Sequence, residues 1–179
     1  MERIVYQGRM IEIVEREVDF GKIKKIFEIG RRSPGVRLII PKGDRILLSK
    51  EFRHEVNGYD YRLPGGKVYD TLAEYNEALS SKADLTEAAT RAAIKEAHEE
   101  VGIVVKRISP FHRSVCGSTI EWDLFYFLVE EYEEDKQHLE QGEDISVEFL
   151  DKEKVREMCL DGSISEERSA LVMLRYLGG

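Results

Sequence analysis

Three glutamates lie close together in the run AAIKEAHEEVGI, residues 92–103. Glu96 and Glu100 are one helical turn apart and Glu99 lies beside them, so in a helix the three carboxylates share one face. Like charges at this spacing cost an isolated helix roughly 0.2–0.5 kcal/mol per pair, and Lys95 is the one cation within reach, beside Glu99. A solvated acidic face is one interpretation. The rigid, oxygen-rich spacing also suits Mg²⁺ or Mn²⁺, and this predicts a metal site.

The stretch LPGGK, residues 63–67, is the second candidate for chemistry. Gly65 and Gly66 lack side chains, so their amides or carbonyls can approach a ligand closely. Any tight turn could use two glycines, and alone the stretch says little. Beside a carboxylate helix it predicts a site built from one loop and one helix.

These carboxylates need a helix that is held firmly in place. Asp84, with Glu87 three residues later, resembles a capping box, and Gly102 is a suitable C-terminal stop, so a helix is expected over residues 85–101. Small residues recur along this helix with i+4 spacing and should pack closely against a sheet or loop. They are Ala89, Ala93, Ala97 and Val101.

Most of the remaining chain has the pattern of strands. The first 30 residues alternate loosely and predict two or three strands with turns at Gly8 and Gly21. A hairpin is expected around Lys42-Gly43-Asp44, and a short helix at 71–80. The other expected elements are strands at about 103–109, 111–116, 121–130 and 145–151, a loop at 130–144, and closing helices at 151–159 and 166–177, the last with Leu171, Leu174 and Leu177 on one face. Mixed strands and helices predict an α+β sandwich of helices on a sheet.

Composition limits the possible partners. The 179-residue chain is 42% hydrophobic with a net charge of −8, which fits a globular protein and not a surface that follows nucleic-acid backbones. A metal ion can still bridge an acidic protein and a phosphorylated ligand. Cys116 and Cys159 are too few for a zinc-ligand set and are expected to be free thiols. The sequence has no apolar signal segment and no long apolar run, so we expect a cytoplasmic protein without a membrane partner.

The run from Glu87 to Ile103 resembles the Nudix box, G-x5-E-x7-R-E-U-x-E-E-x-G-U with U aliphatic. Its spacing fits throughout, with Lys95 where the family has Arg and Ala97 as a U residue. The counterpart of the first glycine is Gly66, but 20 residues separate it from Glu87 instead of five. We interpret residues 68–82 as an insertion, expected to form a helical flap near the site.

Most of the chain is similar to ADP-ribose pyrophosphatases and related nucleotide-sugar hydrolases. The resemblance implies a Nudix α/β/α sandwich with a mixed sheet, in which residues 34–179 form the catalytic domain. It also implies an N-terminal β extension, residues 1–33, that builds a homodimer and contacts substrate. Two departures leave the substrate open: SVCGSTIE, residues 114–121, lacks the proline found in ADP-ribose hydrolases, and no glutamate precedes Pro64. Dinucleoside polyphosphates, nucleoside triphosphates and a catalytically silent ligand sensor are the alternatives.

The resemblance implies metal-dependent hydrolysis of a nucleoside diphosphate linked to another moiety, giving a nucleoside monophosphate and a phosphorylated sugar. The metal, Mg²⁺ or possibly Mn²⁺, would bind Glu96 and Glu100, with Glu99 as a ligand or neighbour and the Gly65 carbonyl as a further ligand. A general base must come from elsewhere, and Glu143 is the best candidate as base or ligand. Glu140 and Asp144, in the same acidic loop, are weaker candidates.

Substrate contacts are expected from cations and from the glycine turn. Arg53 and Arg32 could pair with phosphate oxygens, and Gly66 and Lys67 lie beside them in the expected site. Three aromatic residues could stack on a base or ribose, although strand aromatics are more often core: Tyr6, Phe27 and Trp122. The four histidines lack the spacing of metal ligands and are expected to be incidental: His54, His98, His112 and His138.

Overall fold

The computed structural model describes residues 2–53 and 57–178 of the chain. The strands are β1 (Glu2–Gln7), β2 (Glu12–Asp19), β3 (Lys24–Arg31), β4 (Gly35–Ile39), β5 (Pro41–Lys42), β6 (Arg45–Arg53), β7 (Gly58–Arg62), β8 (Ile103–Ser114), β9 (Ile120–Glu121), β10 (Leu124–Glu134) and β11 (Ile145–Asp151). The helices are α1 (Leu72–Ser81), α2 (Leu85–Glu96), a π-helical turn (Ala97–Val101), α3 (Lys152–Leu160) and α4 (Glu167–Gly178). None of the helices in these ranges is long and apolar enough to cross a membrane.

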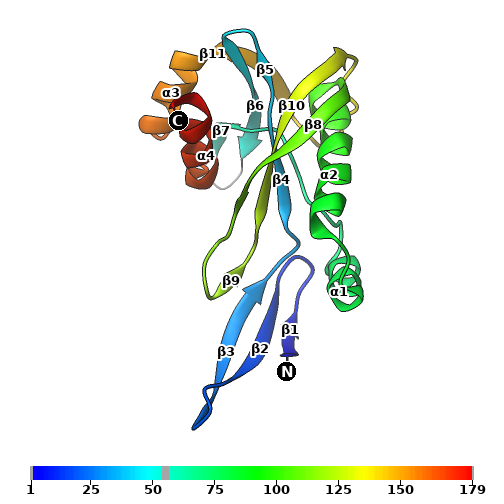
Figure 1. The fold of residues 1–179 in the computed structure, drawn as a ribbon. Coiled ribbons are helices and arrows are strands. Elements are labelled where there is room, and N and C mark those ends of the chain that lie inside the picture. The colour runs from blue at the N-terminus through cyan, green and yellow to red at the C-terminus, as the bar shows by residue number, and fades with distance from the viewer. Residues whose placement is uncertain (1, 54–56, 179) are drawn as a thin grey trace.

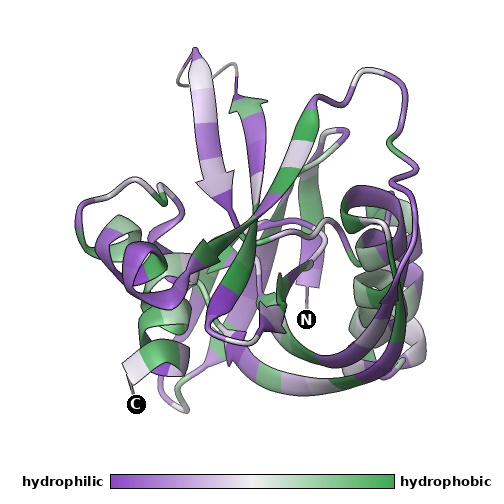
Figure 2. Ribbon diagram, turned by 90° about the horizontal axis from the view of Figure 1, so that it is seen from above, coloured by the Kyte–Doolittle hydropathy of each residue, from purple (hydrophilic) through white to green (hydrophobic). Residues whose placement is uncertain are grey.

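Two central sheets lie between two layers of helix. One has the strand order β4-β10-β8, with β4 and β10 parallel, and the other has the order β11-β6-β5 with β7 also on β6. Helix α2 covers one side, and α3 and α4 cover the other (Figure 1). Figure 2 shows the strands between the two groups of helices. This is the α/β/α sandwich that the sequence predicted.

Alternation along the strands builds the two cores. In β4, Val36 and Leu38 face the core under α2, whereas Ile39 belongs to the core under α3 and α4. Strand β6 alternates in the same way, with Leu47 on the first side and Leu48 on the second. Side chains of successive strand residues point to opposite faces, so a sheet covered on both faces needs apolar residues at every position.

Residues 2–31 form three strands, as predicted, and these pair antiparallel in a separate sheet that β9 joins parallel to β3. Its order is β1-β2-β3-β9, and its turn at Gly21 has a positive φ of 82°. This sheet projects from one end of the sandwich (Figure 1). Helix α1, which is capped by a Thr71–Glu74 capping box, connects to it because Asn76 donates to Glu12 at 3.0 Å. Most of residues 68–82, the segment interpreted as an insertion, forms this helix.

Two sequence predictions about strands were wrong. The strands expected at 103–109 and 111–116 are one strand, β8, because a register shift between Tyr126 and Phe127 accommodates the proline at 110. Part of the expected loop at 130–144 belongs to β10, which runs to Glu134. The hairpin expected around Lys42-Gly43-Asp44 is confirmed, because β5 and β6 pair antiparallel on either side of this turn. Its first strand is short, since β4 joins the other sheet.

The closing helix α4 buries a different face from the one predicted. Ala170, Val172 and Met173 are in the core, whereas Leu171 is 51% exposed. Of the three leucines at i+3 spacing, Leu177 packs partly against this core, whereas Leu171 points away from it. Cys116 and Cys159 are free thiols, as expected.

Candidate active site

Helix α2 lies against the sheet through its small residues, as predicted. Ala89, Ala93 and Ala97 are fully buried, and Val101 is 6% exposed. Asp84 caps the first turn by accepting from the amides of residues 86 and 87. The last turn, Ala97–Val101, is π-helical and ends at Gly102, whose φ is 73°. The π turn departs from the regular helix expected over 85–101, and it carries two of the three glutamates.

The glycine turn and the carboxylate helix meet. The Gly65 amide donates to Glu100 Oε2 at 2.9 Å. A Cβ on Gly66 would lie 2.0 Å from Glu96 Oε1, and a Cβ on Gly65 would lie 2.1 Å from the Val36 carbonyl oxygen. Neither position has room for a side chain, because Gly65 packs against β4 and Gly66 packs against the Glu96 carboxylate.

The carboxylates in this site are hard to keep ionised. Burial, followed in size by the charge of Glu96, raises the pKa of Glu100 to about 8, and burial raises that of Glu96 to about 7. Glu99 pairs with Lys95 at 3.3 Å, the one ion pair that these three glutamates form within the described residues. Two crowded carboxylates with no cation between them fit a hard divalent ion, which prefers oxygen ligands.

The acidic loop is attached to the end of this helix. The amide of His138 donates to the Glu99 carbonyl at 2.9 Å, and the Gln137 side chain donates to the Glu100 carbonyl at 2.6 Å. The charge of Glu143 contributes to the raised pKa of both Glu96 and Glu100, and the charge of Glu140 contributes to the raised pKa of Glu96.

The other two acids of the loop have local roles. The amide of Glu140 donates to Glu143 Oε2 at 2.9 Å, which closes the turn between them. Asp144 accepts from the Tyr59 hydroxyl at 3.1 Å, so its carboxylate is directed to β7. Among the three acids considered from the sequence, Glu143 is the best placed toward the carboxylate helix.

A cavity of about 360 Å³ lies on the other side of the glycine turn. Its lining includes all four residues that the sequence suggested for substrate contacts: Arg32, Arg53, Gly66 and Lys67. The Nε atoms of Arg32 and Arg53 are buried and have no hydrogen-bond partner in the described part of the chain. Buried N–H groups without acceptors favour an anionic ligand. A larger cavity of about 520 Å³ lies between α1 and the N-terminal sheet, but its charges already pair with one another, as in Arg16–Glu121.

A family model, the NUDIX domain, matches residues 31–168. The chain belongs to the Nudix family. It is therefore a Nudix pyrophosphohydrolase, the enzyme class that the sequence predicted. A solved structure described as the crystal structure of ADP compounds hydrolase is similar in fold, with a TM-score of 0.70 at 15% identity. The similarity covers 99% of this chain and 94% of that chain, and no curated protein matches the sequence.

The Nudix box has its two ends in different environments. Glu96 and Glu100 are directed to the glycine turn, whereas Glu87 is exposed and pairs with Arg91 at 2.5 Å. The residue that replaces the family's arginine, Lys95, pairs with Glu99 on the outside of the helix.

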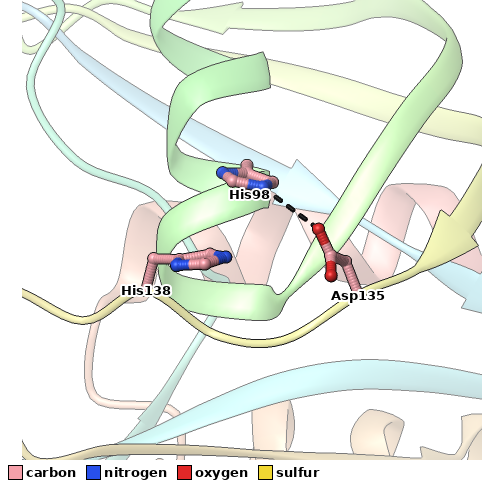
Figure 3. Close-up of side chains that lie close together, drawn as sticks. All are labelled: His98, Asp135 and His138. Carbon is pink, nitrogen blue, oxygen red and sulfur yellow. Dashed lines mark hydrogen bonds and ion pairs between the residues drawn. The ribbon is translucent and has the colours of Figure 1, made fainter.

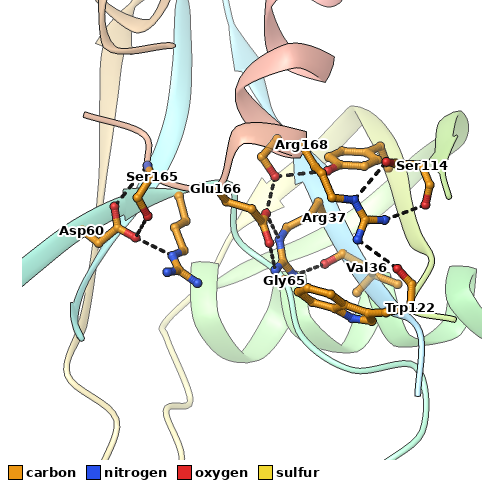
Figure 4. A network of polar contacts seen from close by, with 12 residues as sticks. Val36, Arg37, Asp60, Gly65, Ser114, Trp122, Ser165, Glu166 and Arg168 are labelled. Carbon is orange, nitrogen blue, oxygen red and sulfur yellow. Dashed lines mark hydrogen bonds and ion pairs between the residues drawn. The ribbon is translucent and has the colours of Figure 1, made fainter. Parts of the chain in front are cut away.

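Sequence reasoning missed a polar network beneath the cavity of this Nudix domain. Arg37 donates to both carboxylate oxygens of Glu166, at 2.8 Å each (Figure 4). Arg168 donates to the carbonyls of Ser114 and Trp122, at 2.6 and 2.9 Å. The signal was an arginine inside the apolar run GVRLIIP, since a charge in a fully buried strand needs a partner.

Trp122 contributes to this network through its ring. The Arg32 guanidinium lies 4.3 Å from the ring centroid and that of Arg168 lies 5.2 Å from it. Trp122 was considered as a stacking partner for a base, whereas the geometry places it against two guanidinium groups. Tyr6 and Phe27, the other two aromatic candidates, are exposed on the N-terminal sheet, 61% and 41% respectively.

Proposed function

We propose that the protein hydrolyses the pyrophosphate bond of a nucleoside diphosphate linked to another moiety, with ADP-ribose or a nucleotide sugar as the substrate. The products would be a nucleoside monophosphate and a phosphorylated sugar. One observation carries the proposal: the turn Pro64-Gly65-Gly66 separates a carboxylate group on α2 from a cavity lined by arginines. A diphosphate needs both, because its metal-bound oxygens and its remaining anionic oxygens lie side by side.

The carboxylate side would hold Mg²⁺ or Mn²⁺. Glu96 and Glu100 are the proposed main ligands, with Glu99 at the side and the Gly65 carbonyl as a further ligand. The bound ion would neutralise phosphate charge and lower the pKa of a water molecule. The fit rests on the donor atoms: two buried carboxylates repel each other until a cation joins them.

The arginine side would bind and orient the diphosphate. The Arg32 guanidinium lies against Trp122, and its buried Nε has no partner among the residues that the structure describes, which leaves this N–H free to bind a ligand. Arg53 Nε also has no hydrogen-bond partner among residues 2–53 and 57–178, while its Nη2 pairs with Glu51 at 2.5 Å. Lys67 and the Gly66 backbone complete the wall between the arginines and the carboxylates.

Glu143 is the proposed general base, or a further ligand. Its side chain accepts from the amide of Glu140, and this bond holds it in the loop that meets the helix end. A carboxylate in this position could take a proton from an attacking water molecule. Glu99 and Glu100 would orient that water from the helix side.

The choice of a nucleoside diphosphate derivative is supported by the fold shared with the ADP compounds hydrolase. The substrate proposal can be tested with a panel that holds ADP-ribose, nucleotide sugars, a dinucleoside polyphosphate and a nucleoside triphosphate. Each is incubated with Mg²⁺ or Mn²⁺, and phosphate is measured after phosphatase is added. We expect faster turnover of ADP-ribose or a nucleotide sugar than of the dinucleoside polyphosphate or the nucleoside triphosphate. Faster turnover of a triphosphate would contradict the substrate, and no turnover of any compound would favour a ligand sensor.

The N-terminal β extension is proposed to form a homodimer. Residues 24–28 of β3 are exposed throughout, and they include Ile26 and Phe27 at 63% and 41%. Apolar residues on a projecting sheet without a core of its own favour a partner surface. A second copy of the chain is the proposed partner. Light scattering should give a dimer, and Ile26→Glu should give a folded monomer. A monomeric wild-type protein would contradict this.

A further inference from the structure

Two histidines and an aspartate that are far apart in the sequence come together beside the end of α2. His98 comes from the π turn, and Asp135 and His138 come from the segment after β10. One ligand atom from each residue lies within 4.8 Å of the others. Figure 3 shows the three side chains on the same side of the helix end. No regular spacing relates positions 98, 135 and 138, so the group could not be predicted from the sequence.

We propose that His98, Asp135 and His138 form a second metal site, for a borderline divalent ion such as Zn²⁺ or Co²⁺. Imidazole nitrogens prefer such ions, whereas carboxylates alone suit Mg²⁺. Two imidazoles and one carboxylate are a common ligand set of three, with the remaining position open to water. The two sites therefore differ in chemistry: oxygen ligands at Glu96 and Glu100, and mixed nitrogen and oxygen ligands here.

The backbone already holds the three residues near each other. The amide of Asp135 donates to the Gly102 carbonyl at 2.7 Å, and the amide of His138 donates to the Glu99 carbonyl at 2.9 Å. His98 Nε2 lies 3.3 Å from Asp135 Oδ2, and the two imidazole rings stack with centroids 4.6 Å apart. Only side-chain torsions must change for binding.

The required movement is small. Tetrahedral Zn²⁺ with bonds of about 2.0–2.1 Å places its ligand atoms about 3.4 Å apart. The His98–Asp135 pair already meets this distance at 3.3 Å. The remaining atoms, within 4.8 Å, must approach by rotation of the His138 ring. The side chains of His98 and Asp135 are 44% and 43% exposed, so an ion in solution can reach them.

This site is separate from the proposed catalytic carboxylates. Glu100 contacts the amide of Gly65, and Glu96 lies against Gly66, whereas His98 faces the segment after β10. A bound ion would join this segment, which leads to Glu143, to the end of the helix. Binding itself needs neither substrate nor the proposed reaction.

Zn²⁺ titration of chelator-treated protein tests the proposal, with excess Mg²⁺ present to fill oxygen-only sites. All variants carry Cys116→Ser, because an exposed thiol also takes Zn²⁺. One equivalent of Zn²⁺ is expected to bind. His98→Gln and His138→Gln should each lower the Zn²⁺ affinity by more than about 100-fold. Removing a residue that only hydrogen-bonds to a metal ligand lowers metal affinity by roughly 10–100-fold, and removing the ligand itself should have a larger effect. Matched controls use the remaining histidines, which should have no effect: His112→Gln, and His54→Gln, whose residue lies outside the described ranges.

Two further measurements distinguish loss of this site from unfolding and from Zn²⁺ binding at Glu96 and Glu100. Co²⁺ should give visible absorption bands of nitrogen coordination in the protein, and His98→Gln should remove them while circular dichroism shows an unchanged fold. The same titration in Glu96→Gln/Glu100→Gln should retain the Zn²⁺ equivalent, so a failure of the proposed hydrolysis would leave this result unaffected. Equal Zn²⁺ affinity in wild type and in His98→Gln/His138→Gln would overturn the site and leave an ordinary histidine–aspartate hydrogen bond.

Discussion

Gly66 lies directly against the carboxylate of Glu96, 30 positions later in the chain. A Cβ on Gly66 would be 2.0 Å from Glu96 Oε1 and 2.5 Å from the carboxylate carbon. All three nearest atoms belong to the end of a flexible side chain and none to the backbone. A methyl group here would therefore displace the carboxylate and leave the fold intact.

Gly66→Ala is expected to reduce kcat strongly with little loss of stability. The displaced Glu96 carboxylate can no longer complete the proposed metal site, whereas the turn keeps its backbone bonds to β4. Activity with Mg²⁺ and thermal unfolding together measure the two effects. Gly30→Ala is a matched control, since its Cβ would also meet a side-chain end, Ile120 Cδ1 at 3.0 Å, on the N-terminal sheet. Equal activity of the two variants would contradict the role of Gly66.

Glu100→Gln is expected to lower kcat by roughly 100-fold or more, because the variant loses a proposed metal ligand. Loss of a residue that only hydrogen-bonds to a metal ligand already lowers activity by roughly 10–100-fold. The metal-free variant should be at least as stable as the wild type, because a buried, repelled carboxylate is replaced by a neutral amide. Steady-state kinetics and chemical denaturation measure the two outcomes. Glu87→Gln, on the exposed side of α2, should keep the wild-type rate. Near-wild-type turnover of Glu100→Gln would remove it from the metal site.

The sequence predicted the parts of the site that depend on local spacing. Helix α2 follows from the Asp84 cap, the small-residue stripe and Gly102, and the carboxylate group follows from that helix. The glycine turn was recognised only because a carboxylate helix accompanies it in the sequence, since any tight turn could use two glycines after a proline. The prediction of a regular α-helix was wrong for the last turn, Ala97–Val101, because a π-helical turn has no simple signal in the pattern of side chains.

The parts that could not be predicted depend on contacts between distant segments. Acidic residues of β10 resemble a loop in sequence, but in the sheet Glu130 pairs with Arg107 and Glu134 pairs with Lys42. The partners lie on other strands, so the sequence shows only like charges in a row. The same reason hid the network of Arg37 and Glu166, which are joined across the whole domain.

Arg32→Lys is expected to raise KM by about 10–100-fold with a smaller effect on kcat, because hydrogen bonds to charged groups are worth about 1.5–3 kcal/mol. Lysine keeps the charge but lacks the planar group that lies on Trp122 and the Nε directed to the cavity. Initial rates across substrate concentrations measure the two constants. Arg107→Lys, at an exposed ion pair on β8, is the control and should leave both constants unchanged. An unchanged KM in Arg32→Lys would place the diphosphate elsewhere.

Glu143→Gln is expected to lower kcat while leaving KM and stability close to the wild type. The amide oxygen of glutamine can still accept from the Glu140 amide, so the loop keeps its turn, but the proton acceptor is lost. A pH–rate profile measures this, because the acidic limb that belongs to a general base should disappear. Asp144→Asn is the companion variant, since Asp144 is bonded to Tyr59 and should not affect the profile. Full activity of Glu143→Gln would exclude it as base and as ligand.

Glu166→Gln tests whether the buried pair with Arg37 stabilises the domain at neutral pH. Burial alone would raise the pKa of Glu166, but the hydrogen bonds and charge of Arg37 outweigh it and lower the pKa below its ordinary value of 4.5. The stabilisation is therefore complete above about pH 4.5 and is lost as the pH falls through the folded-state pKa. Leaving Arg37 buried without its partner should cost about 3–5 kcal/mol at pH 7.

Denaturation of wild type and Glu166→Gln from pH 7 downward measures that loss of stabilisation, and the difference in stability should shrink as the pH falls. Glu153→Gln is the control: its carboxylate is 78% exposed beside Arg156, and exposed pairs contribute about 0–1 kcal/mol at any pH. A difference between wild type and Glu166→Gln that stayed constant down to the acid transition would show that shape, and not the charge of Glu166, holds Arg37 beneath the cavity.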